Sequence, residues 1–145
     1  MGLVLALWIY TSSVKPIPTM NKVQSTLTEQ IQEALSNYNN GESPESKMKG
    51  IFQIRALADM HPDNADLQWH MGLFSMQSGQ YEKAVARFEK VISLNAQRVD
   101  AYMQMALSFA ALQDTSSAQN VLSTLIEKSK GDLQQRAEVM LEKLK

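Results

Sequence analysis

The sequence contains no cysteine, and this absence removes several classes of protein at once. Without a thiol the chain has no disulfide framework, no cysteine-based zinc finger and no cysteine nucleophile. Neither sign of charge is in excess. The sequence contains 14 lysines and arginines and 15 aspartates and glutamates, which gives a net charge of −1. There is no run of basic residues, which argues against a surface that binds nucleic acid. We therefore expect no nucleic-acid partner.

Patterns typical of catalytic and metal sites are missing as well. The two histidines, His61 and His70, do not flank a glutamate at the spacing of a metalloprotease helix. The glycines are dispersed at turns and packing positions and form no phosphate-binding loop. The serines lack a neighbouring base and an oxyanion motif. We expect no enzyme activity, no cofactor and no metal site.

Long apolar runs are scarce, and the clearest one lies at the amino terminus from Gly2 to Tyr10. It is shorter than the ~20 residues that a membrane-spanning helix needs, and no basic residue precedes it. Its aromatic end, followed by Lys15, is typical of a membrane interface. We predict a signal or anchor segment over residues 1–14 and a proline-containing linker over 15–20. A core-docked or amphipathic helix is the alternative.

What the chain does contain is a self-similarity from Ala65 to Asp132, with a period of about 34 residues. A fixed period of this length is typical of stacked helix-turn-helix units. No strand pattern accompanies it, so we predict an all-α fold. The identical pairs one period apart are Asp66/Asp100, Met71/Met105, Ala84/Ala118 and Ile92/Ile126.

The residues on either side of this period also follow helical spacing. Residues 21–64 contain two apolar helical patterns, and the second begins at Ser43-Pro44. We predict a degenerate earlier pair there, with a longer loop and a first helix that is off register. Residues 133–145 combine one apolar stripe with one polar face, which is typical of the helix that caps a repeat array.

The small and aromatic residues of the period carry a resemblance to a known family. Gly72 in the first helix and Ala84 in the second allow the pair to approach closely, and Phe88 fills the gap toward the next pair. With Gly79 at the turn, residues 65–98 resemble a tetratricopeptide repeat. The resemblance implies an α-solenoid of helix-turn-helix pairs that acts as a protein-interaction scaffold.

Residues 99–132 resemble a second repeat, with two departures. Gln113 stands in place of the turn glycine, and Lys130 replaces the closing proline. In this family the first helix of each pair lines a concave groove, which implies a partner protein or peptide lying there. The resemblance places the following residues in that groove: Asp66, Trp69, Leu73, Met76, Gln77, Asp100, Met103, Leu107, Ala110 and Ala111.

The predicted groove is unusually apolar for a protein surface. Such a patch suits an amphipathic helix or an apolar peptide segment, and methionines adapt readily to a partner. Some family members bind carboxylate tails through lysine and asparagine, but Trp69, Leu73 and Gln104 stand at those positions here. We therefore do not expect carboxylate binding. The alternative is that the helix over residues 21–38 covers the patch.

These patterns predict a non-catalytic interaction scaffold that is tethered to a membrane. The layout suggests a bacterial cell envelope with the repeats in the periplasm, and a cytoplasmic location is the alternative. Two other functions stay open. The chain could form a structural homo-oligomer through its apolar groove, or it could be an accessory subunit of an envelope enzyme complex.

Overall fold

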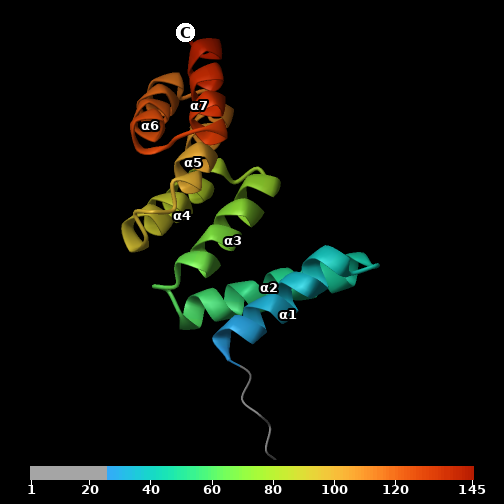
Figure 1. The fold of residues 1–145 in the computed structure, drawn as a ribbon. Helices are drawn as coiled ribbons and strands as arrows, with labels where there is room; N and C mark the ends of the chain where they lie inside the picture. Colours follow the sequence, from blue (N-terminus) through green and yellow to red (C-terminus); the bar gives the residue numbers. More distant parts are fainter. Residues whose placement is uncertain (1–25) are drawn as a thin grey trace, which may run out of the picture.

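The computed structural model describes residues 26–145, which form seven α-helices (Figure 1). The helices are α1 Leu27–Asn40, α2 Pro44–Met60, α3 Ala65–Gln77, α4 Tyr81–Leu94, α5 Asp100–Ala111, α6 Thr115–Lys128 and α7 Asp132–Lys143. No strand occurs within residues 26–145, which confirms the predicted all-α fold.

The predicted anchor segment 1–14 and linker 15–20 lie outside the described residues. None of the helices that the structure describes is long and apolar enough to cross a membrane.

The helices pack as successive helix-turn-helix pairs (Figure 1). α1 packs with α2, α3 with α4, and α5 with α6, while α7 packs against α6 at the carboxyl end. Neighbouring pairs are joined by contacts of α2 with α3 and of α4 with α5. This arrangement is the predicted α-solenoid, in which each pair buries its apolar side against the next.

The second helices of the three pairs keep the period seen in the sequence. α2, α4 and α6 end at Met60, Leu94 and Lys128, so each end lies one period after the one before. The first pair therefore follows the period in its second helix, although its sequence looks degenerate. Three series of buried residues share this spacing: Gly50, Ala84, Ala118; Ile54, Phe88, Leu122; and Leu57, Val91, Leu125.

Small residues stand where the two helices of a pair cross. A Cβ atom added to Gly72 would lie 2.7 Å from Cε1 of Phe88. A Cβ atom added to Gly50 would lie 2.5 Å from the carbonyl oxygen of Ala34. Both distances are well inside van der Waals contact, so a larger residue would push the helices apart. Phe88 is fully buried and also packs in an apolar cluster with Ala101 of the next pair, as the repeat pattern predicts.

Side chains cap the starts of several helices. Ser43 Oγ accepts a hydrogen bond from the Ser46 amide ahead of Pro44, the first residue of α2. Asn64 and Asp114 cap α3 and α6 in the same way. Such caps satisfy amides that have no partner within the helix, which explains where the chain turns into each helix.

The turns of the second and third pairs share one backbone geometry with different residues. Gly79 has φ +71°, and Gln113, one period later, has φ +60°. In each turn the next amide donates to a carbonyl five residues back, Gln80 to Ser75 at 2.8 Å and Asp114 to Phe109 at 3.0 Å. This helix ending favours glycine in the left-handed position. Gln113 therefore carries backbone strain that Gly79 does not.

Gln113→Gly is expected to raise the free energy of unfolding by about 1 kcal/mol, because removal of the Cβ atom relieves that strain. Gly79→Ala is expected to lower it by about 1 kcal/mol for the converse reason. Urea denaturation followed by circular dichroism measures both changes. Gln113→Ala serves as the control, since it removes the side chain and keeps the strain. Equal stabilisation by Gln113→Ala and Gln113→Gly would contradict this explanation.

Candidate protein-binding groove

The groove residues that the sequence predicts on α3 are partly built into the core. Trp69, Leu73 and Met76 are half-buried and pack against the apolar cluster around Phe88. The Trp69 ring meets the Phe88 ring edge-on, with 5.5 Å between the ring centroids. Asp66 is exposed at the start of the helix. The tryptophan therefore has a structural role as well as a place on the surface.

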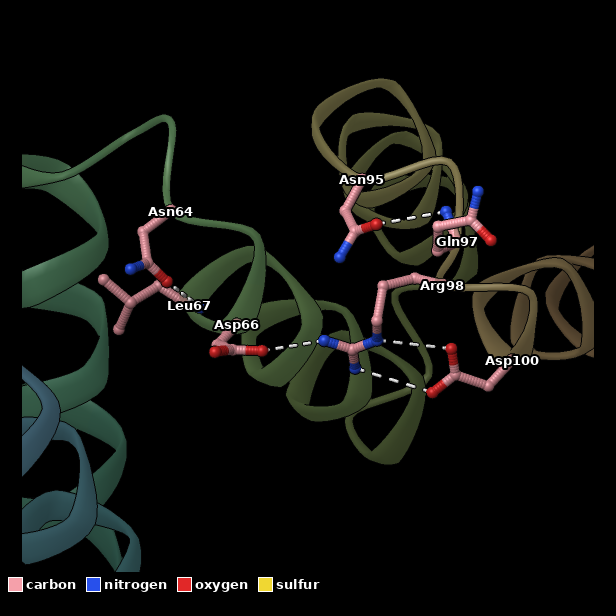
Figure 2. Close-up of polar contacts among 7 residues, drawn as sticks. All are labelled: Asn64, Asp66, Leu67, Asn95, Gln97, Arg98 and Asp100. Carbon is pink, nitrogen blue, oxygen red and sulfur yellow. Dashed lines mark hydrogen bonds and ion pairs between the residues drawn. The ribbon is translucent and has the colours of Figure 1, made fainter.

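Arg98, which was not among the predicted groove residues, organises the polar end of this face. It lies in the loop between α4 and α5, and its guanidinium carbon is 4.7 Å from the centroid of the Trp69 ring. Its Nη1 donates to Asp66 Oδ1 at 2.7 Å, and its Nε donates to Asp100 Oδ1 at 3.3 Å (Figure 2). One arginine thus joins two aspartates that occupy equivalent positions in successive repeats.

The sequence did contain a signal for Arg98. An aspartate recurs at residues 66 and 100, and the arginine lies two residues before the second of them. Two carboxylates at equivalent positions on neighbouring helices favour a cation between them. The period alone could not reveal it, because Asn64 and Asp132 stand one period before and one period after Arg98.

The first described helix meets α3 at the opposite end from Trp69. The Tyr38 ring packs on Phe74 with centroids 4.8 Å apart, and the Tyr38 hydroxyl donates to Oε1 of Gln77. Gln77 is therefore the predicted groove residue that α1 contacts. Trp69 packs instead in a cluster whose described members come from α3 to α6.

The predicted groove residues on α5 meet α7 at a pocket of about 450 Å³. Met103 is 4% exposed and belongs to a core cluster with Ala137 of α7, whereas Leu107 is 37% exposed. Ala110 is half-buried and Ala111 is exposed on the last turn of the same helix. The pocket therefore has Met103 as a deep wall and Leu107 at its mouth.

The other wall of the pocket comes from α7, the helix that was predicted to cap the repeat array. Val139 is 51% exposed and lines the pocket together with Met140. Arg136 and Lys143 place positive charge beside this apolar surface, and Arg136 Nη1 lies 3.8 Å from Asp132 Oδ2. The sequence did indicate that α7 takes the place of a first helix. The repeats begin at residues 65 and 99, so a third repeat would begin at residue 133.

The buried polar side chains of the described residues are satisfied within the fold. No buried side-chain nitrogen or oxygen in this part of the chain lacks a hydrogen-bond partner. Residues 26–145 also hold no group of three or more histidine, aspartate or glutamate side chains placed to bind a metal. Burial lowers the pKa of His70, Arg98 lowers it further, and Asp66 opposes the shift. The imidazole beside Trp69 is therefore biased toward its neutral form.

Comparison with protein families confirms the resemblance seen in the repeats. Residues 75–140 match the family model described as Tetratricopeptide repeat. Tetratricopeptide repeat domains are generally protein–protein interaction modules, and typically they are not catalytic. None of the curated proteins compared with the chain matches it.

Solved structures share the fold at low sequence identity. The TPR domain of OM64 from Arabidopsis superimposes with a TM-score of 0.64 at 13% identity, covering 81% of this chain and 98% of that one. The N-terminal domain of stress-induced protein-1 (STI-1) from C. elegans gives a TM-score of 0.65 at 11% identity, covering 83% and 98%. Both likenesses establish the helical-pair architecture.

The contact between Arg98 and Trp69 can be measured as a coupling energy. Trp69→Ala is expected to lower the free energy of unfolding by about 2–3 kcal/mol, because it removes a half-buried ring from the Phe88 cluster. The Trp69→Ala/Arg98→Ala double-mutant cycle is expected to give a coupling of about 0.5–1 kcal/mol from the cation–π contact.

Arg136→Ala is the matched control for that cycle, because Arg136 lies on α7 and its change should add to that of Trp69→Ala. Chemical denaturation of the single and double variants supplies all the values. Additive changes for Trp69→Ala and Arg98→Ala would show that the two side chains do not stabilise each other.

Proposed function

We propose that the chain is a non-catalytic scaffold that binds a helix or peptide of a partner protein along the face formed by α3, α5 and α7. The pocket between α5 and α7 carries this proposal. Its exposed apolar side chains, Leu107 and Val139, sit at the mouth of a concave apolar site. Grouped apolar side chains of this kind are typical of surfaces that bind a partner.

The proposed contact is divided between two parts of the face. At the α5–α7 pocket, an apolar partner side chain would cover Leu107, Val139 and Met140, each full burial contributing about 1.5–3 kcal/mol before ordering costs. At the other part, Asp66 and Asp100 bind the guanidinium of Arg98, which lies over the half-buried Trp69 ring. The predicted groove residues Leu73, Met76 and Gln77 extend the face toward the end of α3.

Affinity capture with the intact, detergent-extracted protein tests this function. We expect the Leu107→Ser/Val139→Ser variant to lose at least about ten-fold in affinity for the captured partner, because it makes the pocket mouth polar. Phe52→Ser is the matched control, since Phe52 is equally apolar, 55% exposed and located on α2. Met103→Ala is unsuitable, because Met103 lies in the core.

The outcomes separate the alternatives. Equal capture by all three proteins would place binding elsewhere and overturn the proposal. Recovery of the chain alone, with a dimer in light scattering that the double variant abolishes, would favour the homo-oligomer. A captured enzyme complex whose binding depends on Leu107 and Val139 would identify the chain as an accessory subunit.

We also propose that residues 1–14 tether the scaffold to a membrane, with the repeats in the periplasm of a bacterial envelope. The uncharged run from Gly2 to Tyr10 and the Lys15 that follows it support the tether. We expect the full chain to stay with membranes after a carbonate wash and a chain starting at residue 20 to be released. Release of both would contradict the tether. Protease protection in spheroplasts distinguishes the periplasm from the cytoplasm.

A further inference from the structure

A second and larger cleft, of about 880 Å³, lies between α2 and α4. Met71, Phe74 and Ser78 of the α3 segment line it from below. Helical spacing places these residues on the opposite side of α3 from Trp69 and Leu73. The cleft is therefore separate from the proposed groove.

The floor of this cleft carries an apolar strip beside the polar side chains of Gln68 and Ser75. Met48 and Ile51 of α2 face Met71 and Phe74 of α3 across it. Met48 is 46% exposed, so this apolar surface continues outward along α2. An apolar strip between two helical walls matches the apolar face of an amphipathic helix.

The rim of the cleft is basic. Arg55 of α2 and Lys83, Arg87 and Lys90 of α4 line it, and among the described lining residues Asp59 is the one acid. This arrangement gives the cleft an excess of positive charge. A positive rim around an apolar floor favours a ligand that combines apolar and acidic side chains.

The present partners of the rim cations leave most of this charge uncompensated. Arg87 Nη1 donates to Gln68 Oε1 at 2.6 Å, and Lys83 Nζ donates to Gln80 Oε1 at 2.6 Å. Both acceptors are neutral amides. Lys90 pairs with Asp63 at 3.0 Å, but these side chains are 45% and 78% exposed, so the pair is weak.

In the next repeat, larger side chains fill the space that corresponds to this cleft. Tyr102 and Phe109 stand one period after Gln68 and Ser75, and both pack in an apolar cluster with Val121 of α6. The smaller or polar residues at 68 and 75 leave the floor of the first cleft accessible. The cleft is therefore a local feature of the junction between the first two described pairs.

We propose that this cleft binds an acidic amphipathic helix of a partner protein. Its apolar face would cover Met48, Ile51 and Phe74, and its carboxylates would pair with Arg55, Lys83 and Arg87. The amino-terminal residues of the chain itself do not suit the site, because residues 1–25 contain no aspartate or glutamate and include Lys15 and Lys22. With its groove on the other side of α3, the domain could then hold two partners at once.

Fluorescence anisotropy with the full chain tests the cleft directly. The probe is a labelled synthetic amphipathic helix of leucine, alanine and glutamate, and its matched control carries lysine in place of every glutamate. We expect the acidic helix to bind and the basic helix not to bind. Arg55→Glu/Lys83→Glu is expected to weaken binding of the acidic helix at least about ten-fold, because it reverses two rim charges.

Two further variants control this experiment. Lys128→Glu/Lys130→Glu makes the same change in net charge at exposed residues outside the cleft and should alter affinity less than about three-fold. Leu107→Ser/Val139→Ser should leave binding of the acidic helix unchanged, since these residues line the other pocket. Circular dichroism should match that of the parent chain for every variant, because all the substituted side chains are exposed.

The proposal is overturned if the Lys128→Glu/Lys130→Glu variant loses as much affinity as the cleft variant, or if the basic helix binds equally. Amide chemical-shift changes confined to α5 and α7 would assign the acidic helix to the groove instead. A dimer of the parent chain that Arg55→Glu/Lys83→Glu converts to a monomer would make a second copy the occupant. Failure of the acidic helix to bind, together with capture of anionic lipid vesicles that the same variant abolishes, would assign the cleft to a membrane surface.

Discussion

The structure depends on how closely the two helices of each pair approach. Gly50, Ala84 and Ala118 occupy equivalent positions on α2, α4 and α6, and each is buried. Because these residues have little or no side chain, a large residue on the same helix can fill the interior. On α4, for example, Phe88 follows Ala84 and packs against Gly72 of α3. The second helix of each pair covers only part of the first helix, so the groove and the α2–α4 cleft both lie on sides of α3 that α4 does not cover.

The repeat pattern predicted most of the fold because its signal is carried by buried residues. Each of the two predicted repeats holds one observed helix pair, α3 with α4 in residues 65–98 and α5 with α6 in residues 99–132. The first pair was harder to recognise, because Tyr38 stands one period before Gly72 and a bulky residue obscures the family pattern. The structure shows the compensation: Gly50 takes the place of an alanine, and its missing Cβ leaves room for the Tyr38 backbone and Cβ.

The candidate site could be predicted only in part, because a helical face is not the same as an exposed surface. The spacing puts Met103 and Leu107 on one side of α5, but it does not show that α7 covers the first and leaves the second open. Val139 also lines the site, although it lies on α7, which was predicted to be a capping helix. The α2–α4 cleft escaped prediction for another reason, since its lining comes from three helices and depends on how they are spaced.

Arg98 links the shape of the repeat array to its charge. Its guanidinium spans Asp66 on α3 and Asp100 on α5, so it acts as a tie between two successive repeats. A cationic ligand that paired with Asp66 or Asp100 would compete with Arg98 and break its ion pair with that aspartate. Since the same arginine covers Trp69, such competition would also uncover the indole ring. The ion pair between two successive repeats and the cover over the Trp69 ring therefore both depend on a single side chain.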